Sequence, residues 1–294
     1  MGWSDDIKYR LNRLDVVGKL IVANIVMFIV PIILRSVFGL FKIPFVNIVE
    51  WLELYPSFER LLFRPWTLIT YGFLHADIWH IFWNMFILWF AAKMILNLFN
   101  GKRFLNIYFL GIIAGGLAFM ISYNIFPFFE NKFGPIVGAS AGVMAALIFI
   151  CTYLPDKEVR LIFFNVKLWY IAAFFVIKDL MLLSSDNGGG SFAHLGGALL
   201  GFMYARQLAN GKDIGAGFGK MMDAISNMFK PRTKSPLKTV HRKTKTNVPF
   251  KKSTTVKSAQ QQKIDAILDK ISKSGYESLT KAEKDFLFKA GKED

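Results

Sequence analysis

Long apolar stretches separated by short polar segments dominate the first two thirds of this 294-residue chain. A helix needs about 20 predominantly apolar residues to cross the hydrocarbon core of a bilayer, which is roughly 30 Å thick. Six stretches meet or approach this length, and we predict a transmembrane helix in each: 17–37, 78–99, 104–126, 136–154, 167–184 and 190–209. The pattern predicts an all-α membrane protein, with a six-span bundle over 17–209 and a short lead-in over 1–16.

The connection between the first two predicted spans, residues 38–77, is rich in aromatic and apolar residues, Trp51 and Trp66 among them. A flexible linker would be more polar. We therefore expect this loop to lie on the membrane surface. Lys and Arg are in excess on the side of the bundle that holds both chain ends, and short cytoplasmic loops carry such an excess. Both termini are expected to be cytoplasmic.

Beyond residue 209 the composition changes from apolar to basic. Residues 230–257 contain ten Lys or Arg and no acidic residue, which predicts a disordered basic linker over 210–262. Beside a membrane domain, this basic stretch favours anionic lipid headgroups as its partner and disfavours nucleic acid. In the last segment, 263–294, apolar residues at helical spacing and a capping box of Thr280 and Glu283 predict short helices.

Composition narrows the class of protein further. With 53% apolar residues and a mean hydropathy of +0.37, the chain is unlike a soluble globular protein. Most of the formal net charge of +15 comes from the basic tail. The single cysteine, Cys151, excludes an intramolecular disulfide and a Cys-based zinc site within one chain. No metal and no cofactor are expected.

Ionisable residues are costly inside a membrane, and they therefore mark candidate functional positions. Three of the four histidines, His75, His80 and His194, lie at or inside predicted spans, and Ser140 lies near the start of the fourth span. Spans two, four and six run in the same direction. His80, Ser140 and His194 are therefore expected at a similar depth, roughly 5 to 10 Å below the outer surface of the bilayer.

These residue types suit nucleophilic hydrolysis. Ser140 is the candidate nucleophile and His194 the candidate base. His80 and Asn84 are four residues apart on one helix face, so both can donate hydrogen bonds to an oxyanion. The Ser140 N–H group, near a helix N-terminus, is a further donor. No carboxylate of the outer leaflet is obviously placed to orient His194, which favours a dyad over a triad.

Two other features are interpreted structurally. Glycines surround the serine at Gly138 and Gly142 and follow the histidine at Gly197 and Gly201, and such small residues allow spans four and six to approach closely. The adjacent Lys178 and Asp179 near the outer end of span five are interpreted as snorkelling or paired groups without a chemical role. His75 is expected to support the first loop.

Three motifs, in their order along the chain, closely resemble those of the rhomboid intramembrane serine proteases. They are His75-x4-His80-x3-Asn84, Gly138-x-Ser140-x-Gly142 and Ala193-His194-x-x-Gly197-x-x-x-Gly201. The resemblance covers residues 17–209 and implies a six-helix core, an outward-facing aqueous cavity, and cleavage of single-span membrane proteins through an acyl-enzyme. It assigns the same roles to the four polar residues. The Trp-Arg pair of many members is replaced by Trp66-Thr67, with Arg64 nearby. The basic extension resembles that of some bacterial members, so a bacterial inner membrane is expected.

Other readings remain open from the sequence. Taken alone, residues 138–142 would be a helix-packing motif, and His194 a structural histidine or part of a proton path. An inactive rhomboid-like protein would bind transmembrane helices without cutting them, although such relatives usually lack the serine or the histidine. A transporter or channel would be expected to show inverted repeats or several intramembrane carboxylates. The oligomeric state has no signal in the sequence.

Overall fold

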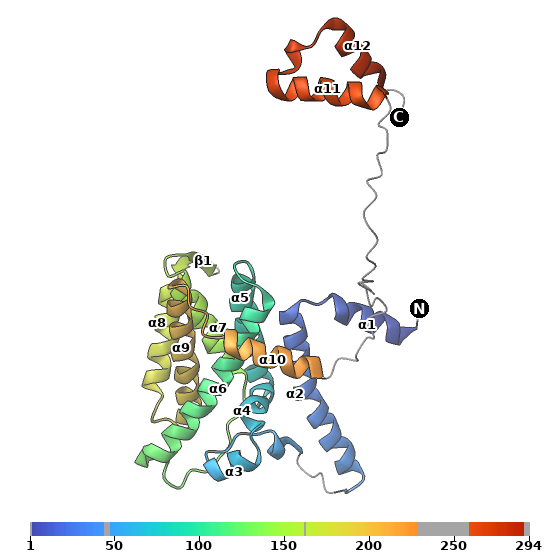
Figure 1. Cartoon of the computed structure of the whole chain (residues 1–294). Coiled ribbons are helices and arrows are strands. Elements are labelled where there is room, and N and C mark those ends of the chain that lie inside the picture. The colour runs from blue at the N-terminus through green and yellow to red at the C-terminus, as the bar shows by residue number, and fades with distance from the viewer. Residues whose placement is uncertain (1, 44–47, 162, 229–258, 291–294) are drawn as a thin grey trace, which may run out of the picture. The chain divides into compact units, whose positions relative to one another are not determined.

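The computed structural model describes residues 2–43, 48–161, 163–228 and 259–290. The chain divides into two compact units, Met1–Pro231 and Arg232–Asp294 (Figure 1). All the segments predicted to span the membrane lie in the first unit. The two helices nearest the C-terminus form the described part of the second unit.

Each predicted span is a helix in the structure. These helices are α2 (Val16–Leu40), α5 (Ile78–Leu96), α6 (Gly101–Ile125), α7 (Ser140–Tyr153), α8 (Leu168–Met181) and α9 (Gly188–Ala209). The predicted all-α membrane fold is confirmed. By length and composition, α2, α5 and α6 can cross a membrane, whereas α7 is a shorter apolar helix. The number of six spans therefore stays a prediction.

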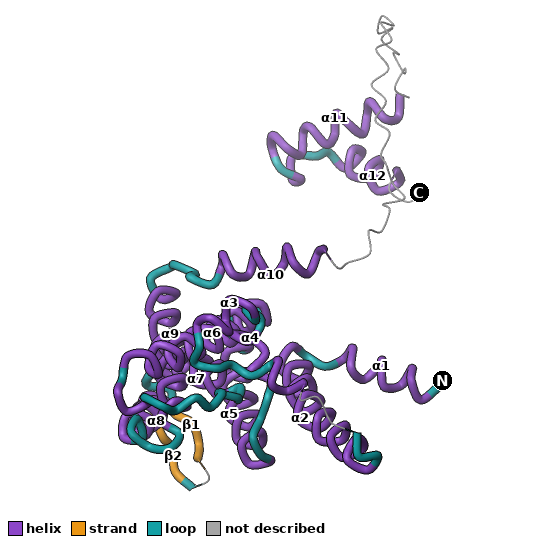
Figure 2. Tube along the Cα trace, turned by 90° about the horizontal axis from the view of Figure 1, so that it is seen from below, coloured by secondary structure: helices purple, strands orange, loops and turns teal. Residues whose placement is uncertain are grey.

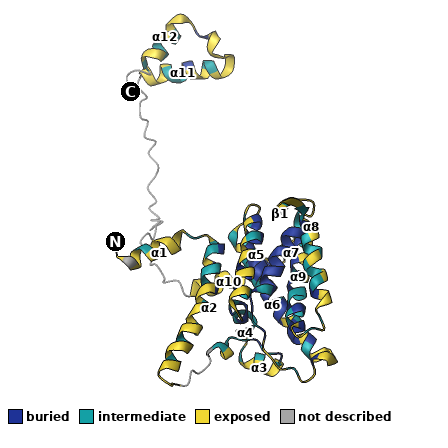
Figure 3. Cartoon of the chain, turned by 180° about the vertical axis from the view of Figure 1, so that it is seen from behind, coloured by how far each residue is buried: buried dark blue, intermediate teal, exposed yellow. Residues whose placement is uncertain are grey.

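Helix α7 forms the centre of the bundle. Every residue from Ala141 to Cys151 is buried, and the helix packs against α5, α6, α8 and α9, with α9 its most extensive neighbour (Figure 3). Its apolar residues extend around the whole helix, which is the pattern of a helix surrounded by others. The first residue of this central helix is Ser140.

The outer faces of the bundle are apolar. Helix α2 exposes aliphatic residues such as Ile29, Ile32 and Ile33, and α5 exposes aromatic residues such as Trp79 and Phe82. Contiguous apolar surface of this extent is unsuited to water and suits contact with lipid. The exposed face of α2 is visible in Figure 3.

The loop between α2 and α5 is organised by short helices. They are η1 (Ile48–Trp51), α3 (Phe58–Phe63), α4 (Thr67–Thr70) and η2 (Tyr71–Phe73). The Arg64 guanidinium lies 4.0 Å from the ring centroid of Trp51. The indole nitrogen of Trp66 donates to the Trp51 carbonyl at 2.8 Å. Arg64 therefore anchors this loop, although it does not directly follow Trp66 as in the Trp-Arg pair.

The first unit contains several elements outside the six helices: α1 (Trp3–Arg13), η3 (Pro127–Phe129), β1 (Glu158–Leu161) and β2 (Phe164–Lys167). The two strands form an antiparallel hairpin between α7 and α8 that the sequence did not predict (Figure 2). A further helix, α10 (Ala216–Met228), corrects the expectation of a disordered linker over 210–262. This helix contacts α6, where Lys102 Nζ lies 2.9 Å from Asp223 Oδ2 in an ion pair.

The second unit contains α11 (Ala259–Ser274), η4 (Tyr276–Ser278) and α12 (Lys281–Ala290). The predicted capping box is present, because the Thr280 N–H donates to Glu283 Oε2 at 2.7 Å and the Glu283 N–H donates to Thr280 Oγ1 at 3.4 Å. Lys270 of α11 also pairs with Glu283, with Nζ 2.9 Å from Oε2. The basic stretch predicted at 230–257 lies outside the described residues.

Candidate active site

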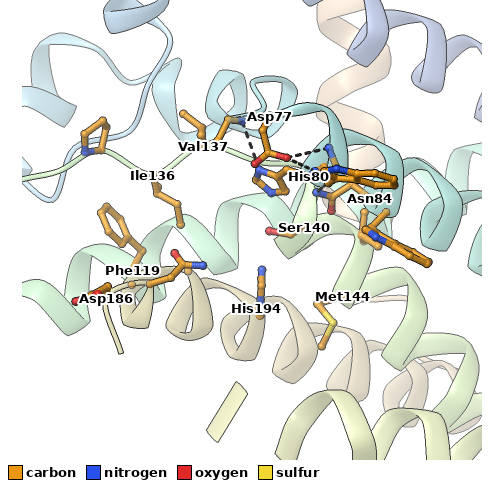
Figure 4. Close-up of a pocket in the computed structure, with 18 of the residues that line it drawn as sticks. Asp77, His80, Asn84, Phe119, Ile136, Val137, Ser140, Met144, Asp186 and His194 are labelled. Atoms are coloured by element: carbon orange, nitrogen blue, oxygen red, sulfur yellow. Dashed lines mark hydrogen bonds between the residues drawn. The ribbon is translucent and has the colours of Figure 1, made fainter. Parts of the chain in front are cut away.

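A cavity of about 870 Å³ is lined by α5, α6, α7, α8 and α9 and by the segment that precedes α7. Its lining includes all four candidate residues, Ser140, His194, His80 and Asn84 (Figure 4). The structure thus brings together side chains from three helices that are far apart in the sequence. Each candidate residue lies within the first two turns of its own helix, so the N-terminal ends of α5, α7 and α9 meet at this cavity.

His80 and Asn84 are positioned by the start of α5. The Asp77 carboxylate caps this helix and accepts from the N–H groups of Trp79 at 2.8 Å and His80 at 2.9 Å. The Ala76 N–H donates to His80 Nδ1 at 3.4 Å, so Nε2 is the nitrogen that carries the proton in the neutral ring. Asn84 is buried, and its amide donates to the His80 carbonyl at 2.9 Å.

Ser140 lies at an N-terminus of α7 that has no side-chain cap. The N-cap residue is Ala139, which offers no side-chain acceptor, so the first N–H groups of α7 remain available to an anion. Gly138 has φ +135°, a conformation that favours glycine. A Cβ atom at Gly138 would lie 2.8 Å from His80 Cε1, so the histidine ring also needs a glycine there.

His194 lies near the start of α9, where close helix packing brings it beside α7. A Cβ atom at Gly197 would lie 2.1 Å from the Ala141 carbonyl oxygen, and no side chain would fit. Figure 4 shows the His194 ring pointing from α9 toward Ser140. Within the described residues no hydrogen bond joins these two side chains, and catalytic hydrogen bonds often tighten only when substrate binds.

The other predicted packing glycines contact different neighbours. Gly201, one turn beyond Gly197, also faces α7, since its Cβ would lie 2.2 Å from the Ala145 carbonyl oxygen. Gly142 faces α6 instead, where a Cβ would lie 2.8 Å from the Tyr108 ring. The small residues of α7 are therefore shared between two neighbouring helices.

Asp179 of α8 contacts His194, and the sequence interpretation missed this contact. Its side chain is 1% exposed, and its Oδ1 atom lies 3.1 Å from His194 Nδ1 and 3.0 Å from Lys178 Nζ. Lys178 and Asp179 do form the pair that was interpreted from the sequence, but a carboxylate also lies beside His194, where none was expected. A carboxylate in an apolar helix needs a partner, but the sequence does not say whether that partner is Lys178, His194 or both.

His75 lies in the loop before α5 and outside the lining of this cavity. Its ring packs edge-on against that of His80, with the centroids 5.2 Å apart. Burial, with a smaller contribution from His80, lowers the pKa of His75 to about 4. A neutral ring at pH 7 is consistent with a supporting position behind His80. Over the ranges that the structure describes, no cluster of three or more His, Cys, Asp or Glu could hold a metal ion.

Comparison with known proteins gives two family matches. A Rhomboid domain model matches residues 63–210, half of the chain. A family of unknown function, DUF6576, matches residues 252–290, which include both helices of the second unit. The first match contains all four candidate residues, and residues 211–251 separate it from the second.

Similar proteins occur in animals, plants and yeast. The chain is 28% identical over 176 residues to the presenilin-associated rhomboid-like protein, mitochondrial, of Bos taurus, covering 57% of this chain and 44% of that protein. It is 29% identical to RHOMBOID-like protein 12, mitochondrial, of Arabidopsis thaliana, covering 51% and 48%. For Rhomboid protein 1, mitochondrial, of Saccharomyces cerevisiae, the values are 27% identity, 58% and 49%.

The matched region spans less than half the length of these relatives. Their names also contradict the expectation of a bacterial-type protein in a bacterial inner membrane, because all three are named as mitochondrial proteins. The family itself agrees with the motifs and with the all-α membrane fold. The chain belongs to the rhomboid family.

Proposed function

We propose that this protein is an intramembrane serine protease that hydrolyses peptide bonds in or near the transmembrane segments of single-span membrane proteins. The observation that carries the proposal is the cavity in which His194 points toward Ser140 at the uncapped N-terminus of α7. A nucleophile, a base and oxyanion donors in one cavity are the components of acyl transfer.

In this mechanism Ser140 Oγ attacks the carbonyl carbon of the substrate while His194 Nε2 takes the hydroxyl proton. The tetrahedral intermediate collapses when the imidazolium gives its proton to the leaving amine, which leaves an acyl-enzyme on Ser140. Water then attacks the ester, with His194 again acting as base and then as acid. Base catalysis of this kind typically contributes about 10²- to 10⁴-fold in rate.

Donors from two helices surround the position of the oxyanion. The N–H group of Ser140 belongs to the first turn of α7, where the helix dipole favours negative charge. The protonated Nε2 of His80 and the second amide hydrogen of Asn84 supply side-chain donors from α5. Loss of one such donor typically costs about 10²- to 10³-fold in kcat. His80 and Asn84 substitutions should therefore impair activity less than loss of Ser140.

Two further assignments follow from charge and from relatives. We propose that the basic stretch 230–257 binds anionic lipid headgroups, since it belongs to the same chain as a membrane domain and follows α10. The names of the relatives favour a mitochondrial membrane as the location. Presenilin association is part of the relative's name and is not proposed for this chain.

The test is cleavage of a panel of single-span substrates by purified protein in detergent or liposomes, beside Ser140→Ala and His194→Ala. We expect cleavage by the wild type and its loss in both variants. A fluorophosphonate should label wild-type Ser140, and the label should be lost in His194→Ala. A wild type that neither cleaves nor reacts would favour the alternative, an inactive rhomboid-like protein that binds transmembrane helices.

A further inference from the structure

We infer that Asp179 is a positioning residue of this site, which holds the imidazole of His194 in the tautomer and orientation that Ser140 requires. The inference rests on the proposed function and deepens it, because it replaces the Ser140 and His194 dyad by a triad that includes Asp179. Three observations carry it: the contact with the ring, the burial of the carboxylate, and the supply of its counter-charge by Lys178.

The carboxylate contacts Nδ1 of the His194 ring, which leaves Nε2 free to act as the base. Asp179 Oδ1 lies 3.1 Å from His194 Nδ1. An ionised carboxylate has no proton to donate, so the hydrogen bond requires Nδ1 to carry the proton. The lone pair then lies on Nε2, the nitrogen that must accept the proton of Ser140. When that proton arrives, the imidazolium is stabilised by the neighbouring negative charge.

The carboxylate occupies an environment that a packing role does not explain. Its side chain is 1% exposed, and Lys178, its ionic partner, has a side chain that is 38% exposed. Among the described residues, no hydrogen bond is made by Asp179 Oδ2. Removing a carboxylate from water while leaving one oxygen unpaired is costly. A pair with Lys178 alone could form nearer the surface, whereas the contact with His194 requires this depth.

Asp179 differs from the other titratable and charged groups near His194 because it hydrogen-bonds to the imidazole ring. From α5 and its cap, His80 and Asp77 line the same cavity, and Asp186 lines it from the connection between α8 and α9. Lys178 lines it from α8. Within the described part of the chain, Asp179 is the acidic group that hydrogen-bonds to the His194 ring.

The decisive variant is Asp179→Asn, which keeps the size of the side chain and removes its charge. We expect kcat to fall by about 10²- to 10⁴-fold, with KM within about threefold, because the ring can then adopt the wrong tautomer. Asp179→Glu, which keeps the charge, should recover part of the activity.

The matched control is Asp156→Asn, which removes a carboxylate from a pair with Lys167 at the other end of α8, where Asp156 Oδ1 lies 3.2 Å from Lys167 Nζ. Its side chain is 80% exposed, and the kcat and KM of this variant should match those of the wild type. Asp179→Asn that matches the wild type in kcat overturns the inference while leaving the proposed function intact. A wild type without cleavage or label overturns both.

A measurement on the unmodified protein covers the case in which Asp179→Asn does not fold. Spectra of ¹⁵N-histidine-labelled wild type report the tautomer of each ring, and His194→Ala assigns the signal. We expect His194 to carry its proton on Nδ1 at neutral pH. A proton on Nε2 would contradict the contact with an ionised Asp179 and overturn the inference.

Discussion

At the scale of single residues, the contact between α7 and α9 depends on glycines that leave no room for a side chain. In Gly201→Ala the new Cβ would lie 2.2 Å from the Ala145 carbonyl oxygen, which is backbone and cannot move alone. The two helices must separate. We expect the free energy of unfolding to fall by about 1 to 3 kcal/mol, measured by thermal unfolding in detergent.

The control for this substitution is Gly217→Ala in α10. Nothing lies within 4 Å of a Cβ at Gly217, and alanine favours helix more than glycine does. The stability of this variant should equal or exceed that of the wild type. Equal stability of Gly201→Ala and Gly217→Ala would show that the backbones of α7 and α9 can relax, and the proposed importance of close packing would then be wrong.

The polar residues of the cavity could be identified from the sequence for a simple physical reason. Ser140 and His194 stand out because polar groups are costly in apolar helices, and their place near helix ends predicted a common depth. The contact of Asp179 with His194 could not be predicted in the same way. Lys178 immediately precedes Asp179 in the sequence and pairs with it, so a local pair already accounted for the charge of Asp179. Only the orientation of α8 beside α9 reveals the contact with His194.

At the scale of elements, the junction of α9 and α10 is held by Asp213. Its carboxylate accepts from the Tyr204 hydroxyl, from Arg103 Nε at 3.1 Å and from the Gly215 N–H at 3.0 Å. Burial alone raises the pKa of Asp213, but these hydrogen bonds and the charge of Arg103 outweigh burial and lower the pKa below its ordinary value of 3.8. The ionised form is therefore favoured by folding.

This direction sets the pH dependence. Because the folded-state pKa is depressed, the stabilisation is present above about pH 4 and is lost as pH falls through the lower, folded-state pKa. We expect Asp213→Asn to lose about 1 kcal/mol at pH 7 relative to the wild type, and the difference to shrink below about pH 4. Unfolding curves measured across this range test the prediction. Asp223→Asn, which breaks a more exposed pair with Lys102, should change stability by less than about 0.5 kcal/mol.

The second unit offers a separate prediction about α12. The hydrogen bonds from the Thr280 backbone, from Lys270 and from the Thr280 hydroxyl lower the pKa of Glu283 to about 2. In Glu283→Gln the charge is lost, and amide hydrogen exchange over the first turn of α12 should become faster at pH 7. Glu277→Gln is the control, because the Glu277 side chain is 93% exposed and its carboxylate pairs with Lys284 at 3.3 Å. Equal exchange in both variants would contradict the role of the capping box.

Elements with a strong hydropathy pattern were predicted well, and those that depend on tertiary contacts were not. Each long apolar stretch became a helix because lipid requires the backbone to satisfy its own hydrogen bonds. The hairpin of β1 and β2 is too short to show a repeating pattern. Helix α10 lies in a region of mixed composition, and its contacts with α6, such as that of Asp223 with Lys102, are not visible in the sequence.

At the scale of the whole molecule, the first unit contains the main core and every residue that lines the cavity. The core cluster runs from Val17 to Ala205, and the cavity residues lie between Ala76 and His194. A chain that ends at Pro231 loses none of them. We expect this truncated chain to keep kcat/KM within about twofold of the full chain in detergent, and to unfold at the same temperature within error. A large loss in either measurement would show that residues 232–294 stabilise or complete the site.

The proposed function of the basic stretch predicts a difference that appears only with lipid. Each Lys or Arg near an anionic surface contributes about 1 kcal/mol, and residues 230–257 contain ten. Proteinase K should therefore cut this stretch of the full chain more slowly in mixed micelles with anionic lipid than in zwitterionic ones. The difference should disappear at about 1 M salt, where the Debye length is only about 3 Å. A variant with the ten basic residues changed to Gln should be cut at the same rate in both micelles. If the wild type also behaves in this way, the charge of this stretch serves a partner other than the lipid surface.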